Sequence, residues 1–202
     1  MRRRVVPIIA AMLLAGAAPE AQSQVRGFPV YAVQVPRGVT LAGDVAFPND
    51  DPCPDVCAGA GVSGGFGRVG LSAMVATSGF GGLVTVSVLA PGRSPFGLVL
   101  QAGASGTASS GLFQAPFGAG FSVWIPTPLV SVQPWIGLRG QYMSPGNGWE
   151  GDGAVHFGFS AGLALTLLNG LGVRAAYDQV LLAGNNLSTF GVGVFFSFDP
   201  GL

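Results

Sequence analysis

Apolar and polar residues alternate with a period of two along much of the chain. Between residues 113 and 125, Phe117 and Phe121 share one parity, whereas Gln114 and Ser122 fall on the other. Successive side chains of a β-strand point to opposite faces of the sheet, so this pattern predicts a strand with one apolar face and one small or polar face. Glycine and proline recur too often for long helices. We therefore expect an all-β fold.

The same alternation recurs in ten segments, most of which have the ~9 to 11 residues that a tilted strand needs to cross a bilayer. The predicted strands are 39–47, 58–66, 69–77, 83–89, 96–104, 113–125, 130–142, 154–167, 171–178 and 188–198. Short and long connections alternate between many of them, as they do in membrane barrels. The pattern predicts a closed antiparallel transmembrane β-barrel, with ten strands favoured and eight as the alternative.

Turn residues test the strand pairing, because residues that pair across a hairpin must share a face. Residues 67–68 form a two-residue loop with Gly first, as a type II′ turn requires, and this loop pairs Phe66 with Val69. At residues 168–170, a three-residue loop with Gly170 in the left-handed position of a G1 bulge keeps apolar residues opposite apolar ones. Both hairpins agree with the predicted parity.

Two features near the middle of the chain concern the strand register. A four-residue loop at 126–129 pairs Ile125 with Val130 and again keeps apolar residues together. Pro116 and Pro134 each lack the backbone N–H that a ladder position donates. We therefore expect a β-bulge near these prolines.

Composition decides whether lipid or water surrounds the predicted barrel. Charged residues make up 9% of the chain and hydrophobic residues 49%, whereas a soluble domain carries roughly 25% charged residues. No Asp, Glu or Arg between residues 58 and 198 falls on the apolar parity. A soluble secreted barrel that binds an apolar ligand is the less favoured alternative, because it would expose a large apolar face to water. In lipid the same face is stabilised, and closure leaves no unpaired strand edge.

The N-terminus carries the pattern of a secretory signal peptide. Three arginines at 2–4 precede an apolar stretch at 5–18, and small residues at positions 21 and 23 suit a signal peptidase. About 14 apolar residues fall short of the roughly 20 that a membrane-spanning helix needs. We expect a cleaved signal peptide at 1–23, a periplasmic lead-in at 24–38, the barrel at 39–198 and a C-terminal tail at 199–202.

Charge in the connections is segregated between the two ends of the predicted barrel. The acidic residues of one end are Asp50, Asp51, Asp55, Glu150 and Asp152. The arginines of the other end are Arg26, Arg37, Arg68 and Arg93. The longer, acidic loops are expected on the outer side. Asp50, Asp51 and Asp55 could share divalent cations with lipopolysaccharide, although a solvated loop rich in turn-forming residues is the favoured interpretation.

Cys53 and Cys57 are the two cysteines of the chain. Export would place them in a compartment that permits disulfides, and we expect them to close a small ring. A metal site would need further ligands nearby, and the single histidine lies far along the sequence. We therefore predict no metal centre.

The last strand resembles the carboxy-terminal signal of Gram-negative outer-membrane β-barrel proteins. In this family a polar residue is followed two positions later by Gly and then by alternating aromatic residues. Gly193, Phe196 and Phe198 match this pattern, whereas Gly191 stands where a polar residue is usual and residues 199–202 extend beyond it. The resemblance implies insertion by the barrel assembly machinery, with Phe196 and Phe198 as recognition positions. It also implies an outer-membrane location among lipids and lipopolysaccharide.

The face opposite the apolar one would line the lumen, and its charged residues are Asp44, Arg139, Arg174 and Asp178. His156 is the single histidine, and the predicted register places Asp178 opposite Ser160, four residues further along. That separation is about 13 Å, too long for a hydrogen-bonded catalytic pair. A net charge of zero also gives no electrostatic basis for binding nucleic acid. We predict a protein without enzymatic activity, cofactor or nucleic-acid partner.

Two functions remain open. In the favoured one, the two lumen arginines neutralise the two aspartates, the lumen is filled, and the barrel has a structural or surface-interaction role. The alternative is a narrow porin-like channel for small solutes, because Gly and Ser line much of the predicted interior and would leave space there.

Overall fold

The computed structural model describes residues 28, 35, 38–49, 56–89, 95–107, 111–144, 153–183 and 186–198. This part of the chain forms eleven strands in one sheet. They are β1 (Val39–Pro48), β2 (Cys57–Phe66), β3 (Val69–Ala76), β4 (Gly79–Leu89), β5 (Phe96–Gly106), β6 (Phe113–Val123), β7 (Ile125–Pro126), β8 (Val130–Met143), β9 (Ala154–Leu167), β10 (Leu171–Leu181) and β11 (Leu187–Phe198). Among the described residues, no helix is long and apolar enough to cross a membrane.

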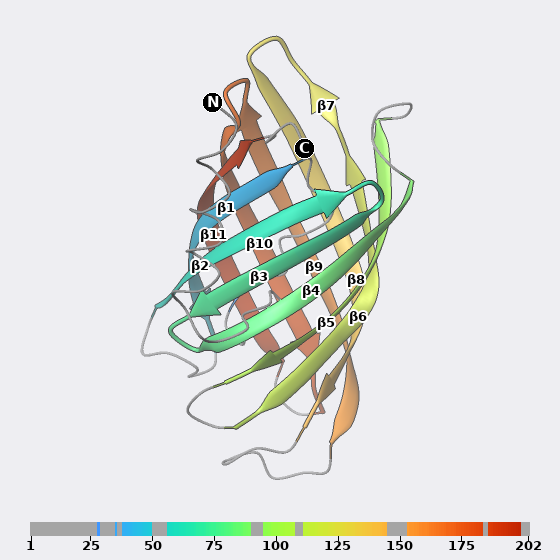
Figure 1. Ribbon diagram of the computed structural model, residues 1–202. Helices are drawn as coiled ribbons and strands as arrows, with labels where there is room; N and C mark the ends of the chain where they lie inside the picture. The colour runs from blue at the N-terminus through green and yellow to red at the C-terminus, as the bar shows by residue number, and fades with distance from the viewer. Residues whose placement is uncertain are drawn as a thin grey trace, which may run out of the picture.

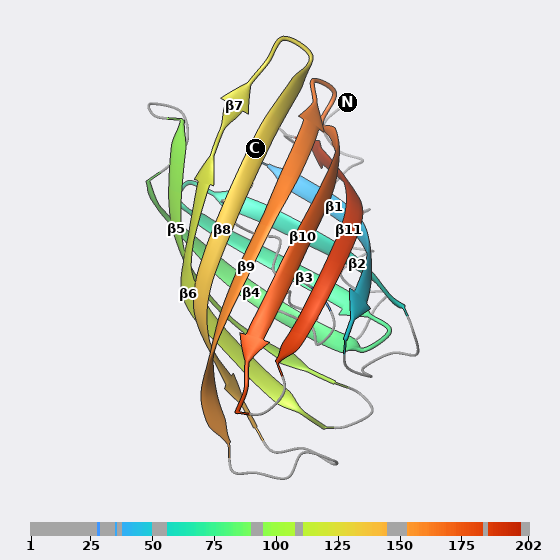
Figure 2. The same ribbon diagram turned by 180° about the vertical axis from the view of Figure 1, so that it is seen from behind.

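The strands close into a barrel (Figures 1 and 2). Except for β6 and β7, strands that follow one another pair in antiparallel fashion; β1 also pairs with β11, and β6 pairs with β8. β2 to β5 run obliquely across one wall, whereas β8 to β10 run more steeply along the other. The two-residue β7 follows β6 after a break at Trp124 and pairs with β8. Within the described residues, the prediction of a closed antiparallel barrel with ten long strands is confirmed.

The two ends of the barrel differ in their connections. The turn end holds the tight turns after β2 and β9, together with Val39 and Phe198, which pair with each other. The loop end lies opposite, where β1 ends at Pro48 and β2 begins at Cys57. The first and last strands therefore enter and leave the barrel at the same end, as an even number of long strands requires.

Strand boundaries follow the predicted ones closely except at β4. The sequence predicts a start at residue 83, but β4 begins at Gly79, which pairs with Ala76 on β3. Gly79, Gly81 and Gly82 indicate a loop by composition. In the structure their backbones pair with β3, so the ladder outweighs the low strand propensity of glycine.

Two predicted hairpins are confirmed. Phe66 pairs with Val69 across the turn after β2. After β9, Gly170 has a φ of +84°, and Thr166 pairs with Gly172 as the three-residue loop requires. A left-handed φ strains residues that carry a Cβ, which explains why glycine stands at this position.

The strand register at the turn before β8 differs by two residues from the predicted one. Ile125 pairs with Val132 and not with Val130, so the predicted loop at 126–129 is wrong. The backbone N–H of Thr127 donates to the carbonyl oxygen of Val130 at 3.1 Å and closes the turn there. A shift of two residues leaves every side chain on the same face, so the apolar pattern cannot distinguish the two registers.

The predicted bulge near Pro116 and Pro134 is wrong. β8 keeps one register with β6 through Pro116 and one register with β9 through Pro134. Each proline therefore removes a ladder donor without inserting an extra residue. A register shift occurs instead between Ser87 and Leu89, where β4 pairs with β5.

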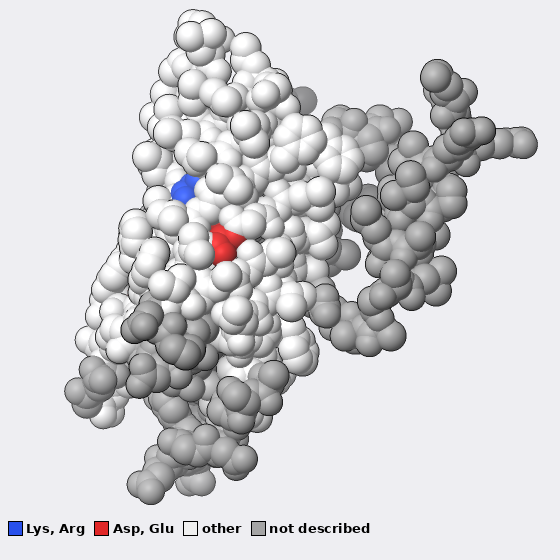
Figure 3. Space-filling model, turned by 90° about the vertical axis from the view of Figure 1, so that its left-hand side faces the viewer, with Lys and Arg blue, Asp and Glu red and all other residues white. Residues whose placement is uncertain are grey.

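The apolar parity faces outward all around the barrel. Leu100 is 52% exposed, Phe117 50% and Leu138 53%, whereas Asp44 on the opposite parity is 4% exposed. Figure 3 shows one side of this surface, which is almost free of charged groups. A face of this kind is stable against hydrocarbon, and water would destabilise it.

Closure of the ladder predicts heat-modifiable migration on a gel. An unheated sample in SDS should keep its closed barrel and run at a different apparent mass from a boiled sample, because closure leaves no free edge at which unfolding begins. The measurement is a pair of lanes, unheated and boiled, from detergent-refolded protein. A single unchanged band in folded protein would contradict the closed ladder.

Candidate functional site

The lumen is where the charged side chains of the strands gather. Asp44 on β1, Arg139 on β8 and Asp178 on β10 are 4%, 7% and 2% exposed. Arg174 on β10 lies close to Asp44, and 14% of its side chain is exposed. The structure brings these four predicted lumen residues together as two ion pairs.

The first ion pair joins β8 to β10 across β9. Arg139 donates from its two terminal nitrogens to the two carboxylate oxygens of Asp178, at 2.7 and 2.6 Å. Its Nε donates to Oε1 of Gln141 at 3.2 Å, and Nε2 of Gln141 donates to Oε1 of Gln114 at 3.1 Å. Paired charges with additional hydrogen bonds tolerate burial, whereas a lone buried charge does not. This network therefore ties β6, β8 and β10 together inside the barrel.

The second ion pair joins β10 to β1 across β11. Nε of Arg174 donates to Oδ1 of Asp44 at 2.9 Å, and its Nη2 donates to Oδ2 at 2.5 Å. The side chain of Asp44 is fully buried. Because β1 and β11 form the closing seam of the barrel, this pair links the two terminal strands through side chains as well as backbone.

Glycines make room for both ion pairs. Gly193 is the register partner of both Asp44 and Arg174, and a Cβ at Gly193 would overlap Oδ1 of Asp44. Gly158 stands opposite Arg139, where a Cβ would lie 3.2 Å from the guanidinium carbon. Each pair reaches across one strand, and a glycine on that strand leaves room for it: a Cβ at Gly193 would overlap the carboxylate, and one at Gly158 would crowd the guanidinium group.

Large apolar side chains also fill the space beside lumen glycines. Trp135 lies beside Gly162, where a Cβ would come within 2.6 Å of its Cε2 atom. The ring of Phe195 lies over Gly172, where a Cβ would overlap it. The expectation that lumen glycines leave space for a solute is therefore wrong at these positions, because neighbouring side chains fill the room.

Three clusters of buried apolar residues also lie among the described residues. The first consists of Phe28, Ala46, Cys57 and Met74. The second consists of Val99, Trp135 and Ala176, and the third of Leu112, Met143 and Val180. All of these residues are at most 7% exposed. Such packing on both sides of the ion pairs shields the charges from water, which strengthens their mutual attraction.

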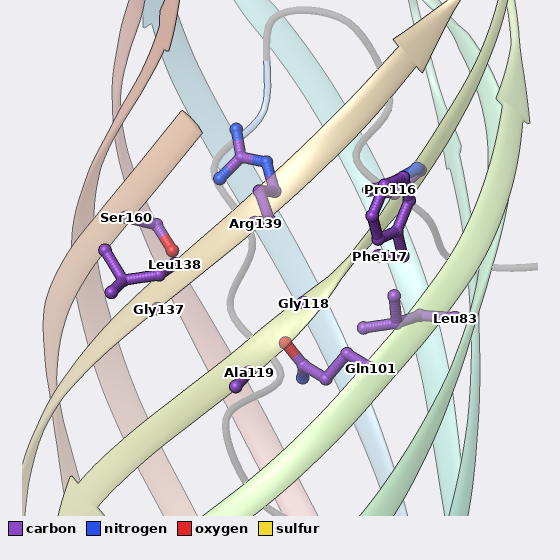
Figure 4. A pocket seen from close by; sticks show the side chains of 10 residues that line it. All are labelled: Leu83, Gln101, Pro116, Phe117, Gly118, Ala119, Gly137, Leu138, Arg139 and Ser160. Carbon is purple, nitrogen blue, oxygen red and sulfur yellow. The ribbon is translucent and has the colours of Figure 1, made fainter. Parts of the chain in front are cut away.

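A small cavity remains beside the first ion pair (Figure 4). Gln101, Gly118, Arg139 and Ser160 are among its lining residues, and its volume is about 20 Å³. A cavity of this volume holds about one water molecule. The hydroxyl oxygen of Ser160 lies close to Gly137: a Cβ added at Gly137 would be 2.9 Å from it.

His156 is half-buried and stands opposite Gln141 on β8. Asp178 stands opposite Ser160, as predicted. Both carboxylate oxygens of Asp178 accept hydrogen bonds from Arg139. Among the described residues, no three His, Cys, Asp or Glu side chains lie close enough to hold a metal ion.

The residues of the resembling C-terminal motif divide between the two faces of β11. Phe196 and Phe198 point outward at 44% and 39% exposure, with stacked rings whose centroids are 5.9 Å apart. Gly193 belongs to the lumen, where it makes room for the ion pair of Asp44. The structure thus gives Gly193 a local role that the motif does not require.

Several predicted features lie outside the described residues. They are the signal peptide at 1–23, the tail at 199–202, Cys53, and the acidic residues Asp50, Asp51, Asp55, Glu150 and Asp152. Cys57 is buried and disulfide-bonded. Its pairing with Cys53 stays a prediction.

Sequence reasoning missed three buried polar residues. They are Ser78, Ser105 and Thr189, at 4%, 5% and 8% exposure. Thr189 shares the parity of Gly193, and Ser105 lies one residue beyond the predicted end of its strand. Thr189 lies within the predicted strand 188–198, so the alternation applied there would have found it, and a strand one residue longer would have found Ser105. Ser78 lies in the turn before β4, where alternation gives no signal.

The arrangement of apolar and charged groups decides the class of protein. Apolar side chains cover the outside, and the ion pairs lie inside. A soluble barrel with an apolar ligand cavity has the opposite arrangement, so that alternative is wrong. The chain is a closed transmembrane β-barrel.

Solved structures of similar fold include the outer membrane enzyme PagL, with a TM-score of 0.48 and 12% identity over 79% of this chain and 99% of that one. Neisserial surface protein A gives 0.40 and 12% over 80% and 97%. The Yersinia pestis outer membrane protein Ail, solved in a phospholipid bilayer nanodisc, gives 0.41 and 12% over 79% and 99%. At these identities the likeness concerns the fold alone. No protein-family model and no curated protein matches the sequence.

The glycine beside the second ion pair gives a stability prediction. Gly193→Ala should lower the free energy of unfolding by on the order of 3 kcal/mol, because the new methyl group displaces Asp44 from Arg174 and leaves buried charges poorly paired. Gly43→Ala is the matched control, since a Cβ there meets no atom within 4 Å, and it should change stability by less than about 0.5 kcal/mol. Urea unfolding in lipid vesicles measures both, and equal effects would refute the role of Gly193.

Proposed function

We propose that this protein is an outer-membrane β-barrel with a structural or surface-interaction role, and that its lumen does not conduct solutes. The observation that carries the proposal is the ion-pair network seated on lumen glycines. Each buried charge is neutralised inside the barrel by a partner of opposite sign: Arg139 pairs with Asp178, and Arg174 pairs with Asp44. Fixed, mutually neutralised charges stabilise a filled barrel and offer little to a passing ion.

The packing of the lumen supports the same proposal. Gln114 and Gln141 are 2% and 1% exposed, so even the uncharged members of the network are shielded from water. The cavity beside Arg139 holds about one water molecule. A porin-like channel for small solutes, the alternative, needs a continuous water-filled path past these side chains.

A role outside catalysis is part of the proposal. A general base must lie within hydrogen-bond reach of the group that it activates. The register places Asp178 opposite Ser160 and His156 opposite Gln141, which separates the two titratable groups along the barrel wall. Arg139 also engages both oxygens of Asp178. The Asp178 carboxylate therefore holds the ion pair with Arg139 and does not act as a general base in this proposal.

The C-terminal strand supports a proposed route to the membrane. Phe196 and Phe198 present stacked rings outward on the last strand, close to the turn end. Aromatic side chains in this position are available to a partner before the strand meets lipid. We propose that they are the positions that the barrel assembly machinery recognises, and that outer-membrane lipids and lipopolysaccharide surround the finished barrel. Export through the signal peptide at 1–23 and a Cys53–Cys57 disulfide complete this proposal.

Planar-bilayer recording tests the closed lumen. The wild-type protein should give no conductance steps above those of a protein-free bilayer, because the network and the apolar clusters obstruct the lumen. Reproducible openings whose conductance changes in Arg139→Ala would contradict the proposal and favour the channel. Leu138→Ala is the control for the substitution itself, since Leu138 faces outward at 53% exposure and should leave the recording unchanged.

A further inference from the structure

Phe28 lies inside the barrel, although the sequence assigns it to a periplasmic lead-in before the first strand. It is 1% exposed and packs in one cluster with Ala46, Cys57 and Met74. These residues belong to β1, β2 and β3, and Ala46 pairs with Cys57 close to the loop end. The ring of Phe28 therefore sits near the end of the lumen opposite to the first residue of β1.

The spacing along the chain allows Phe28 to lie at the height of Ala46. Ala46 is seven residues beyond Val39 (46 − 39 = 7), which corresponds to about 23 Å along the strand. Phe28 precedes Val39 by eleven residues (39 − 28 = 11), and eleven extended residues span up to about 36 Å. The connection is thus long enough to run back along the full height of β1.

Gly38, the residue before β1, lies at the turn end and has a left-handed backbone conformation. Its φ is +75°, a left-handed conformation that favours glycine and allows the chain to bend sharply before β1. Its carbonyl oxygen accepts a hydrogen bond from the backbone N–H of Gly65 at 3.1 Å, which fixes the bend against β2.

We propose that the ring of Phe28 acts as a stopper that closes the lumen at the loop end. The proposal rests on the closed lumen proposed above and names what closes that end. Leu112, Met143 and Val180 form the apolar cluster on the opposite wall. Phe28 supplies the apolar group on the side of β1 to β3, where Ala46 is too small to fill the lumen.

Thiol labelling tests the position of Phe28. In detergent-solubilised protein with the native disulfide intact, the introduced thiol of Phe28→Cys should react with a bulky maleimide at least tenfold more slowly than that of Ala183→Cys. Ala183 is exposed at the loop end and serves as the matched control. Both thiols should react equally fast in urea. Equally fast labelling of the two folded variants, with folding checked by heat-modifiable migration, would overturn the proposal.

A second pair of variants tests whether Phe28 closes the lumen or merely lies in it. Met74→Cys, at a position that is 3% exposed, should be protected while Phe28 is present and should react at least tenfold faster when Phe28→Ala is added. Val35→Ala, a half-buried position of the same segment, should leave that rate unchanged. An unchanged rate in the Phe28→Ala background would overturn the proposal. Conductance by the wild type combined with protection at position 28 would contradict the closed lumen while leaving the position of Phe28 intact.

Discussion

Hydrocarbon around the barrel is the constraint on which the other features depend. No water is available there for backbone N–H and C=O groups, so each must pair with a neighbouring strand and the sheet must close on itself. The pairing of β1 with β11 and of β6 with β8 meets this requirement. Closure then separates two faces completely, and the side chains follow: apolar residues outside, charged and small residues inside.

The inside of a ten-strand barrel is narrow, and this chain packs large lumen side chains against glycines. Arg139 extends over Gly158 to reach Asp178, and Arg174 meets Asp44 over Gly193. The glycines allow charges on strands that are not neighbours to meet. Glycine weakens a strand because it has no side chain to pack, but the same lack of a side chain makes room for the buried network. The backbone hydrogen bonds of the ladder offset the lost strand stability.

The sequence predicts the features that depend on which face of the sheet each residue occupies. It predicts little of what depends on how far a side chain extends across the lumen. Alternation fixed the hairpin of Phe66 with Val69, because a shift of one residue would turn apolar side chains inward. It could not place Ile125 opposite Val132, because a shift of two preserves the faces. It identified the four lumen charges and their mutual neutralisation, but not which arginine pairs with which aspartate, because that depends on side-chain reach across an intervening strand. The alternation predicts no strand around Phe28, so it could not predict that this side chain is buried.

The direct test of hydrocarbon outside the barrel is a spin-label scan along β5 in lipid vesicles. Labels at Leu98, Leu100 and Ala102, whose side chains face outward, should collide strongly with oxygen, which concentrates in lipid, and weakly with a water-soluble nickel complex. Labels at Val99 and Gln101, which face the lumen, should collide weakly with oxygen. Oxygen accessibility should therefore alternate with a period of two. Strong collision with the nickel complex at the three outward positions, or no alternation, would contradict the account.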